Sequence, residues 1–187
     1  TLPGVCHYVG SLGANRREQY VEFPWEKLDG RPLILASVGT MASPKNSRIL
    51  RVIAAACQDF AAQLVIALGK WRETAGTSRD ALETLASNTI VVDFAPQMKL
   101  LQRVAVLITH AGQNTVMEAI SQGVPMIALP RNADQPGMAA SIEYAGVGLC
   151  ESFQLKDPAV LRAKVDRVLC EESFRRLFED STDSILI

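Results

Sequence analysis

Short apolar runs that alternate with helix-forming stretches constrain the fold of this chain most strongly. From Leu33 onward the runs are apolar at consecutive positions, whereas a strand with one face in water would alternate apolar and polar residues. Such runs are typical of parallel strands buried on both faces, and the stretches between them supply the crossover helices. The sequence therefore predicts an α/β fold with a doubly wound, Rossmann-like parallel sheet of about six strands. The expected strands are 33–38, 64–68, 89–94, 104–109, 126–129 and a weaker one at 147–150.

Helix-start and helix-stop residues mark the stretches between the strands. Ser43 and Pro44 form a start signal, because serine can cap a helix and proline fits its first turn; an apolar stripe follows as far as Phe60. Gly123 and Gly146 stand where a left-handed carboxy-terminal cap is expected. The remaining expected helices are 78–86, 96–102, 114–122, 135–144 and 158–171.

The first 32 residues are interrupted by glycine and proline, so we expect residues 1–32 to form an interdomain linker or junction. Residues 33–180 should form one α/β domain, and residues 181–187 a tail. The chain starts at Thr1 without an initiator methionine, from which we expect a processed, excised or partial chain.

Composition argues against several classes of function. The chain of 187 residues has 19 Lys and Arg against 20 Asp and Glu, so it lacks the basic excess that nucleic-acid binding requires. No apolar run approaches the roughly 18 residues of a membrane span, and no secretory signal is present, so we expect a cytoplasmic protein that is not transmembrane. The four cysteines form no C-x-x-C pair, and no metal site is predicted.

Polar residues gather in the loop after the expected strand 104–109, and open parallel sheets bind ligands at such strand ends. A helix amino terminus holds phosphate readily, Gly112 lets the backbone come close, and His110, Asn114 and Thr115 add donors. Glu118 lies on the same helical face as Asn114, where a carboxylate can bind ribose hydroxyls. This loop therefore predicts a site for a nucleoside diphosphate with its sugar.

Each of these residues also has a purely structural interpretation. A histidine at a strand end is often only a hydrogen-bonding group, Asn114 and Thr115 can be ordinary helix-start residues, and Glu118 can simply complement the helix dipole. Their convergence at one strand end favours the phosphate site. The turn at Gly39 and Thr40 is a weaker candidate, because glycine commonly follows a strand.

With these residues in view, the segment 94–135 (FAPQMKLLQRVAVLITHAGQNTVMEAISQGVPMIALPRNADQ) resembles the donor-binding signature of the nucleotide-sugar-dependent glycosyltransferases of the GT-B fold. More narrowly, it resembles the bacterial macrolide and zeaxanthin glucosyltransferase branch of the UDP-glycosyltransferase family. A junction phrase at 7–10 and the loop 37–40 extend the resemblance. The resemblance implies that the chain is the carboxy-terminal half of a GT-B protein, with 33–180 as its nucleotide-sugar donor-binding domain.

The resemblance also implies a role for each site residue. The expected diphosphate contacts are His110, Gly112, Asn114, Thr115, Gly39 and Thr40. The expected nucleoside contacts are Phe94, Ala95, Gln97 and Glu118. The expected donor-sugar contacts are Asp134 and Gln135, where the alternative for Asp134 is a cap on the helix 135–144. No catalytic residue is expected in this chain, because the family's base is a histidine of an amino-terminal acceptor domain, and His7 in the junction is not that residue.

The function implied is inverting transfer of a hexosyl group to a hydroxyl of a small, lipophilic acceptor, with UDP-glucose as the first choice of donor and a TDP-sugar as the second. Phe94 replaces the tryptophan that plant members stack on uracil, which weakens the preference for uridine. No cofactor or metal is expected, and the chain alone should be inactive or nearly so. A lipophilic acceptor would place the protein at the periphery of the membrane. The alternatives are a non-catalytic donor-binding subunit of a split glycosyltransferase and a nucleotide-sugar epimerase of the same fold.

Overall fold

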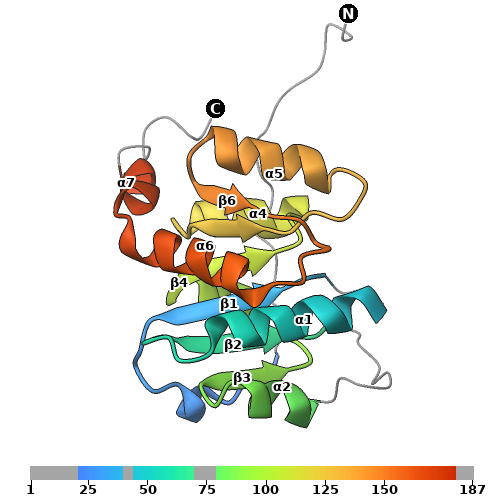
Figure 1. Ribbon diagram of the computed structural model, residues 1–187. Helices are drawn as coiled ribbons and strands as arrows, with labels where there is room; N and C mark the ends of the chain where they lie inside the picture. The colour runs from blue at the N-terminus through green and yellow to red at the C-terminus, as the bar shows by residue number, and fades with distance from the viewer. Residues whose placement is uncertain (1–20, 40–43, 70–78, 180–187) are drawn as a thin grey trace, which may run out of the picture.

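A six-stranded parallel sheet in the order β3-β2-β1-β4-β5-β6 forms the centre of the computed structural model, which describes residues 21–39, 44–69 and 79–179 (Figure 1). All five strand pairings are parallel, so the predicted doubly wound sheet is confirmed. The strands are β1 (Leu33–Ser37), β2 (Gln63–Ala67), β3 (Thr89–Val92), β4 (Val104–Thr109), β5 (Met126–Ala128) and β6 (Gly148–Cys150).

A helix follows each strand at the place that the sequence predicts. They are α1 (Pro44–Cys57), α2 (Arg79–Leu85), α3 (Gln97–Leu101), α4 (Gln113–Ser121), α5 (Gln135–Tyr144) and α6 (Pro158–Cys170). Gly123 and Gly146 have φ angles of 64° and 71°, as expected for left-handed caps. Two short elements were not predicted, the 3-10 helix η2 (Trp25–Lys27) and α7 (Ser173–Glu179). Ser43, the expected cap of α1, lies outside the described residues.

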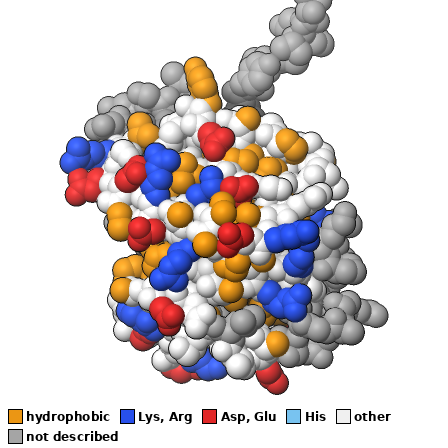
Figure 2. Space-filling model, in the orientation of Figure 1, with side chains coloured by type: hydrophobic (Ala, Val, Ile, Leu, Met, Phe, Trp, Pro, Cys, Tyr) orange, Lys and Arg blue, Asp and Glu red, His pale blue; other side chains and the backbone are white. Residues whose placement is uncertain are grey.

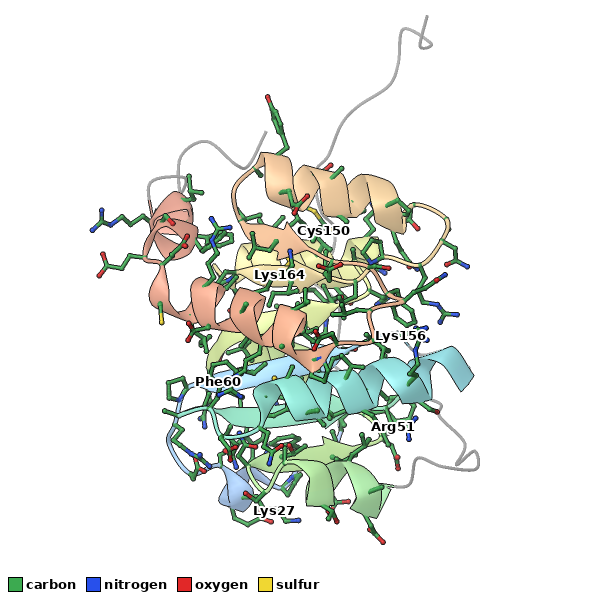
Figure 3. All side chains as sticks on the ribbon, viewed as in Figure 1. Lys27, Arg51, Phe60, Cys150, Lys156 and Lys164 are labelled. Atoms are coloured by element: carbon green, nitrogen blue, oxygen red, sulfur yellow. The ribbon has the colours of Figure 1, made fainter. Side chains whose placement is uncertain are left out.

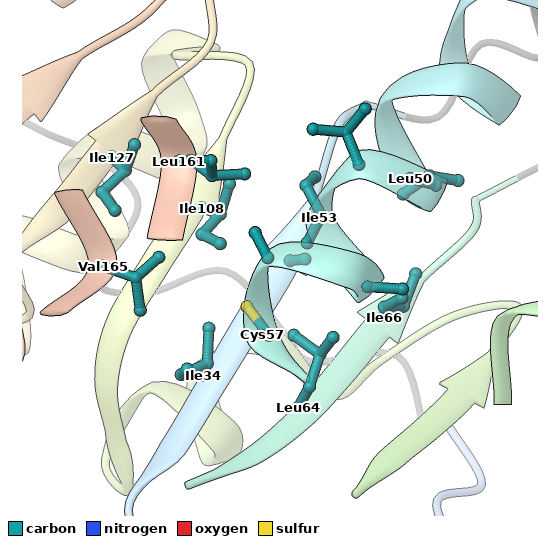
Figure 4. Packing of buried hydrophobic residues seen from close by; sticks show 14 of the residues in the cluster. Ile34, Leu50, Ile53, Cys57, Leu64, Ile66, Ile108, Ile127, Leu161 and Val165 are labelled. Atoms are coloured by element: carbon teal, nitrogen blue, oxygen red, sulfur yellow. The ribbon is translucent and has the colours of Figure 1, made fainter. Parts of the chain in front are cut away.

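The core is divided between the two faces of the sheet. Alternate residues of β1 point to opposite faces, so Ile34 joins the cluster under α1, α2 and α6, and Leu35 joins the cluster under α3, α4 and α5. Figure 4 shows the first cluster, in which Ile53 of α1 and Leu161 of α6 pack onto the strands. Burial on both faces explains why the strands are apolar at consecutive positions.

The described end of the expected junction segment packs against the domain. Phe23 is 6% exposed and belongs to the core on the α3 to α5 side. The Gln63 side chain donates through Nε2 to the carbonyl of Lys27 at 2.8 Å and accepts through Oε1 from the amide of Asp29 at 3.2 Å. Residues 21–32 are thus tied to the start of β2, and their role as part of a linker stays a prediction.

Side chains from the flanking helices α5 and α6 form hydrogen bonds with main-chain groups of the edge strand β6. The amide of Cys150 donates to Glu143 Oε1 at 2.8 Å, and Lys164 Nζ donates to the Cys150 carbonyl at 3.0 Å. Figure 3 shows Lys164 of α6 close to Cys150. Unpaired edge groups are a template for pairing with another strand, so these two contacts close part of that edge.

The surface over α1 and α6 mixes charges of both signs with single apolar side chains (Figure 2). No helix among the described residues is long and apolar enough to cross a membrane.

Replacing Ile53, which is fully buried, by alanine should lower the free energy of unfolding by about 2–5 kcal/mol, because the cavity under α1 cannot close completely. The matched control is Val160→Ala on α6, where the side chain is 40% exposed and the change should be within about 0.5 kcal/mol. Urea denaturation of both variants measures the difference. Similar losses for the two variants would contradict the core described here.

Candidate functional site

The loops that follow the two central strands, β1 and β4, lead to opposite faces of the sheet. β1 and β4 are neighbours, with Ser37 paired to Thr109 at their carboxyl ends. The chain leaves β1 toward α1 on one face and leaves β4 toward α4 on the other. Such a topological switch point opens a crevice where parallel sheets bind ligands. Gly39 and His110, both predicted site residues, follow these two strand ends.

The imidazole of His110 fits between two glycines that come from different strands. A Cβ atom added to Gly112 would lie 2.6 Å from His110 Nε2, and one added to Gly39 would lie 3.4 Å from it. Gly39 also has a φ angle of 95°, which favours glycine. The absence of a side chain at Gly112 therefore makes room for the ring, with Nε2 directed toward this residue, whereas at Gly39 the backbone conformation is what requires glycine.

Burial lowers the pKa of His110 below its ordinary value of 6.5, and the nearby positive charge of Arg131 lowers it further. The main chain of Ser37 and the carboxylate of Asp134 act in the opposite direction. The Nδ1 atom is buried and has no hydrogen-bond partner among the residues that the structure describes. The ring is therefore mainly neutral at pH 7, and a neutral imidazole can donate one hydrogen bond to a ligand.

The start of α4 lies at this switch point, directly after the end of β4. Its N-cap residue is Gly112, which has no side chain to bond the amides of the first turn, where Asn114 and Thr115 lie. Ala111 turns the chain into the helix with a φ angle of 62° and is fully buried. Uncapped N–H groups and the positive end of the helix dipole suit an anion.

Two residues that the sequence predicts as nucleoside contacts, one on α3 and one on α4, are hydrogen-bonded to each other. Gln97 Nε2 donates to Glu118 Oε2 at 2.6 Å, and both side chains are half-buried. Glu118 thus bonds a neighbouring helix rather than the first turn of its own. Phe94, in the loop between β3 and α3, is 46% exposed, and Ala95 packs partly against the core beneath.

The side chain of Gln135, the first residue of α5, is hydrogen-bonded to the main chain of the loop between β5 and α5. Gln135 Oε1 accepts from the amide of Arg131 at 2.9 Å and from that of Asn132 at 3.4 Å. Asp134 is the N-cap residue of α5, but its side chain makes no cap hydrogen bond and is exposed. The structural alternative for Asp134, a helix cap, therefore finds no support in its hydrogen bonding.

The structure brings together His110, Gly39 and Gly112, and separately Gln97 and Glu118. Thr40 lies outside the described residues. Sequence reasoning missed Arg131, whose charge acts on His110. Its position in the polar loop directly before the predicted sugar contacts could have indicated it. Within the described residues, no group of three or more His, Cys, Asp and Glu is placed to hold a metal ion.

The fold and the switch-point loops define an α/β protein of the class that binds ligands at the carboxyl ends of parallel strands. Residues 3–177 match the family model described as "UDP-glucoronosyl and UDP-glucosyl transferase", and the chain belongs to that family.

Similar proteins agree with this assignment. The chain is 35% identical to the zeaxanthin glucosyltransferase of Pantoea ananas over 79% of its own length and 33% of that protein. It is 34% identical to the zeaxanthin glucosyltransferase of Pseudescherichia vulneris over 79% of its length and 34% of that protein. The chain therefore spans about a third of the length of these curated relatives. The crystal structure of the glycosyltransferase VinC in complex with DTDP shares the fold, with a TM-score of 0.68 and 23% identity over 87% of this chain and 39% of that one.

The lowered pKa of His110 should make stability depend on pH. The unfolded chain takes up a proton at this residue near its ordinary value of 6.5, whereas the folded chain does so only at lower pH. Acidification through this range therefore costs stability, which is regained as the pH rises above it. We expect the free energy of unfolding to fall more steeply between about pH 7.5 and 5 for the wild type than for His110→Gln. Equal slopes, or an NMR titration midpoint of His110 at or above 6.5, would refute this.

Proposed function

We propose that this chain is the donor-binding part of an inverting glycosyltransferase that moves a hexosyl group, with UDP-glucose as the first choice of donor, to a hydroxyl of a small lipophilic acceptor. The observation that carries the proposal is the position of His110, held between Gly39 and Gly112 beside the uncapped start of α4. Family membership supports the class of reaction.

In the proposed complex the two linked phosphoryl groups lie against the first turn of α4. Its amides donate to the phosphate oxygens, and the helix dipole favours their negative charge. His110 adds one donor from Nε2, and the side chains of Asn114 and Thr115 add further donors. The glycine at position 112 lets the phosphate come close to the main chain.

The nucleoside lies beside α3 in this proposal. Phe94 has enough exposed ring surface to stack on the base, and the main chain of Ala95 can bond its edge. Glu118 accepts from the ribose hydroxyls. Gln97 donates to one carboxylate oxygen of Glu118 at 2.6 Å, which fixes the carboxylate and leaves the other oxygen for the ribose.

The donor sugar is held by Asp134 and Gln135. The Asp134 carboxylate is exposed and can accept from sugar hydroxyls. Gln135 uses its Oε1 to hold the amides of Arg131 and Asn132, so it can serve the sugar as a donor through Nε2.

In the reaction we propose, the acceptor oxygen attacks the anomeric carbon while the bond from that carbon to the diphosphate oxygen breaks, and the configuration inverts. The acceptor proton passes to a base, which we place in an amino-terminal acceptor domain outside this chain. Negative charge grows on the departing diphosphate, and fixed donors at the start of α4 stabilise it where it develops. This chain alone should therefore bind donor and transfer little.

Calorimetric titration of the chain with UDP, TDP and UDP-glucose tests the proposal. His110→Ala should weaken UDP binding by about 10- to 100-fold, because one hydrogen bond to a charged group is lost. Gly112→Ala should weaken it as well, since its Cβ would lie 2.6 Å from His110 Nε2 and would displace the ring.

Gly137→Ala is the matched control, because a Cβ at that position of α5 meets no atom of the described part of the chain within 4 Å. It should leave UDP binding unchanged. No measurable binding of either nucleotide by the wild type, or equal effects of the two glycine substitutions, would contradict the proposal.

A further inference from the structure

The proposed donor site has a charge imbalance. A nucleotide sugar brings about two negative charges at neutral pH, and Glu118 and Asp134 add carboxylates beside it. The half-buried imidazole of His110 has a lowered pKa and is mainly neutral. Main-chain amides and the partial charge of one helix end must then hold the diphosphate against these carboxylates, unless a cationic side chain contributes.

Arg131 is fixed at this end of the sheet by the main chain around it. It follows β5, the neighbour of β4, and the amide of Leu129 donates to the carbonyl of Thr109 at 2.7 Å, which joins the two strand ends. The amide of Arg131 itself donates to Gln135 Oε1 at 2.9 Å. The Arg131 backbone is therefore anchored one strand away from His110.

A buried aromatic ring positions the guanidinium group. Arg131 Cζ lies 4.9 Å from the ring centroid of Phe153, whose side chain is 5% exposed and belongs to the core under α1 and α6. A guanidinium over an aromatic face is attracted by it, and the contact limits the freedom of a long side chain. Among the described residues, the charged groups that act on His110 are Arg131 and Asp134.

We propose that Arg131, positioned by Phe153, binds the phosphoryl group that carries the sugar in the nucleoside diphosphate donor. The inference rests on the proposed function and assigns a further residue to its site. Arg131 lies three residues before Asp134, so it belongs to the sugar side of the diphosphate. The planar guanidinium can donate two parallel hydrogen bonds to phosphate oxygens. When the bond to the anomeric carbon breaks, the electron pair stays on an oxygen of this phosphoryl group, and Arg131 stabilises that charge.

Calorimetry with uridine, UMP and UDP separates this role from a structural one, because the three ligands differ only in their phosphoryl groups. Arg131→Gln should weaken UDP binding about tenfold or more and change the binding of uridine and UMP less than about twofold. Arg131→Lys keeps the positive charge but loses the two parallel donors of the guanidinium. Its affinity for UDP should therefore lie between those of the wild type and Arg131→Gln. Phe153→Leu should also weaken UDP selectively, since it releases the guanidinium from its ring.

Arg48→Gln is the matched control. Arg48 Nη2 donates to the carbonyl of Gln154 at 2.8 Å, so this variant removes the same charge from a side chain that contacts the residue next to Phe153. It should bind UDP as the wild type does. Equal losses for Arg48→Gln and Arg131→Gln would show a long-range effect of charge and overturn the inference, as would equal losses for uridine and UDP.

Failure of the inference can be told apart from failure of the proposed function. If wild-type chain binds UDP and Arg131→Gln binds it equally well, only the role of Arg131 is wrong. If the wild type binds neither UDP nor TDP, the proposed function is wrong; if it binds TDP alone, the same series is measured with thymidine, TMP and TDP. The melting temperature of each variant shows whether it is folded. If Arg131→Gln does not fold, Arg131→Lys tests whether the bidentate guanidinium is needed.

Discussion

β1 and β4 lie side by side at the centre of the sheet, and the chain leaves them toward opposite faces. Every other feature of the candidate site depends on this arrangement. It places the loop after Ser37 next to the loop after Thr109, although these residues are far apart in the sequence. It also keeps helices from closing over both strand ends, so the start of α4 remains accessible.

The histidine at this point depends on residues that have no side chain. A side chain at Gly112 would compete with the imidazole for the same volume, and one at Gly39 would be strained by the positive φ angle of that residue. Partial burial lowers the pKa of the ring and keeps it mainly neutral, so in the proposed site it would act as a hydrogen-bond donor rather than as a fixed positive charge. In the proposed site the formal positive charge comes instead from Arg131, in the loop after β5. Shape and charge would then be supplied by loops that follow different strands.

The sequence was sufficient for the fold because burial on both faces leaves a strong pattern. The bounds of β4 and α5 agree with those predicted, whereas α7 was missed because it is short and contributes mainly Phe174 to the core. Site residues within one loop were predicted from local chemistry, but their binding roles remain proposals. The bond between Gln97 and Glu118, and the packing of Arg131 on Phe153, depend on tertiary contacts that no local pattern contains.

Ala111 has a consequence for how the site meets its ligand. An alanine with a φ angle of 62° costs about 1–2 kcal/mol relative to its usual conformations, and glycine would relieve that cost. The same side chain, however, is fully buried and packs with the core under α4. It therefore excludes backbone conformations of the loop that glycine would permit. The directions of the helix-start amides are therefore already set, and a diphosphate that binds as proposed would cost this loop little conformational entropy.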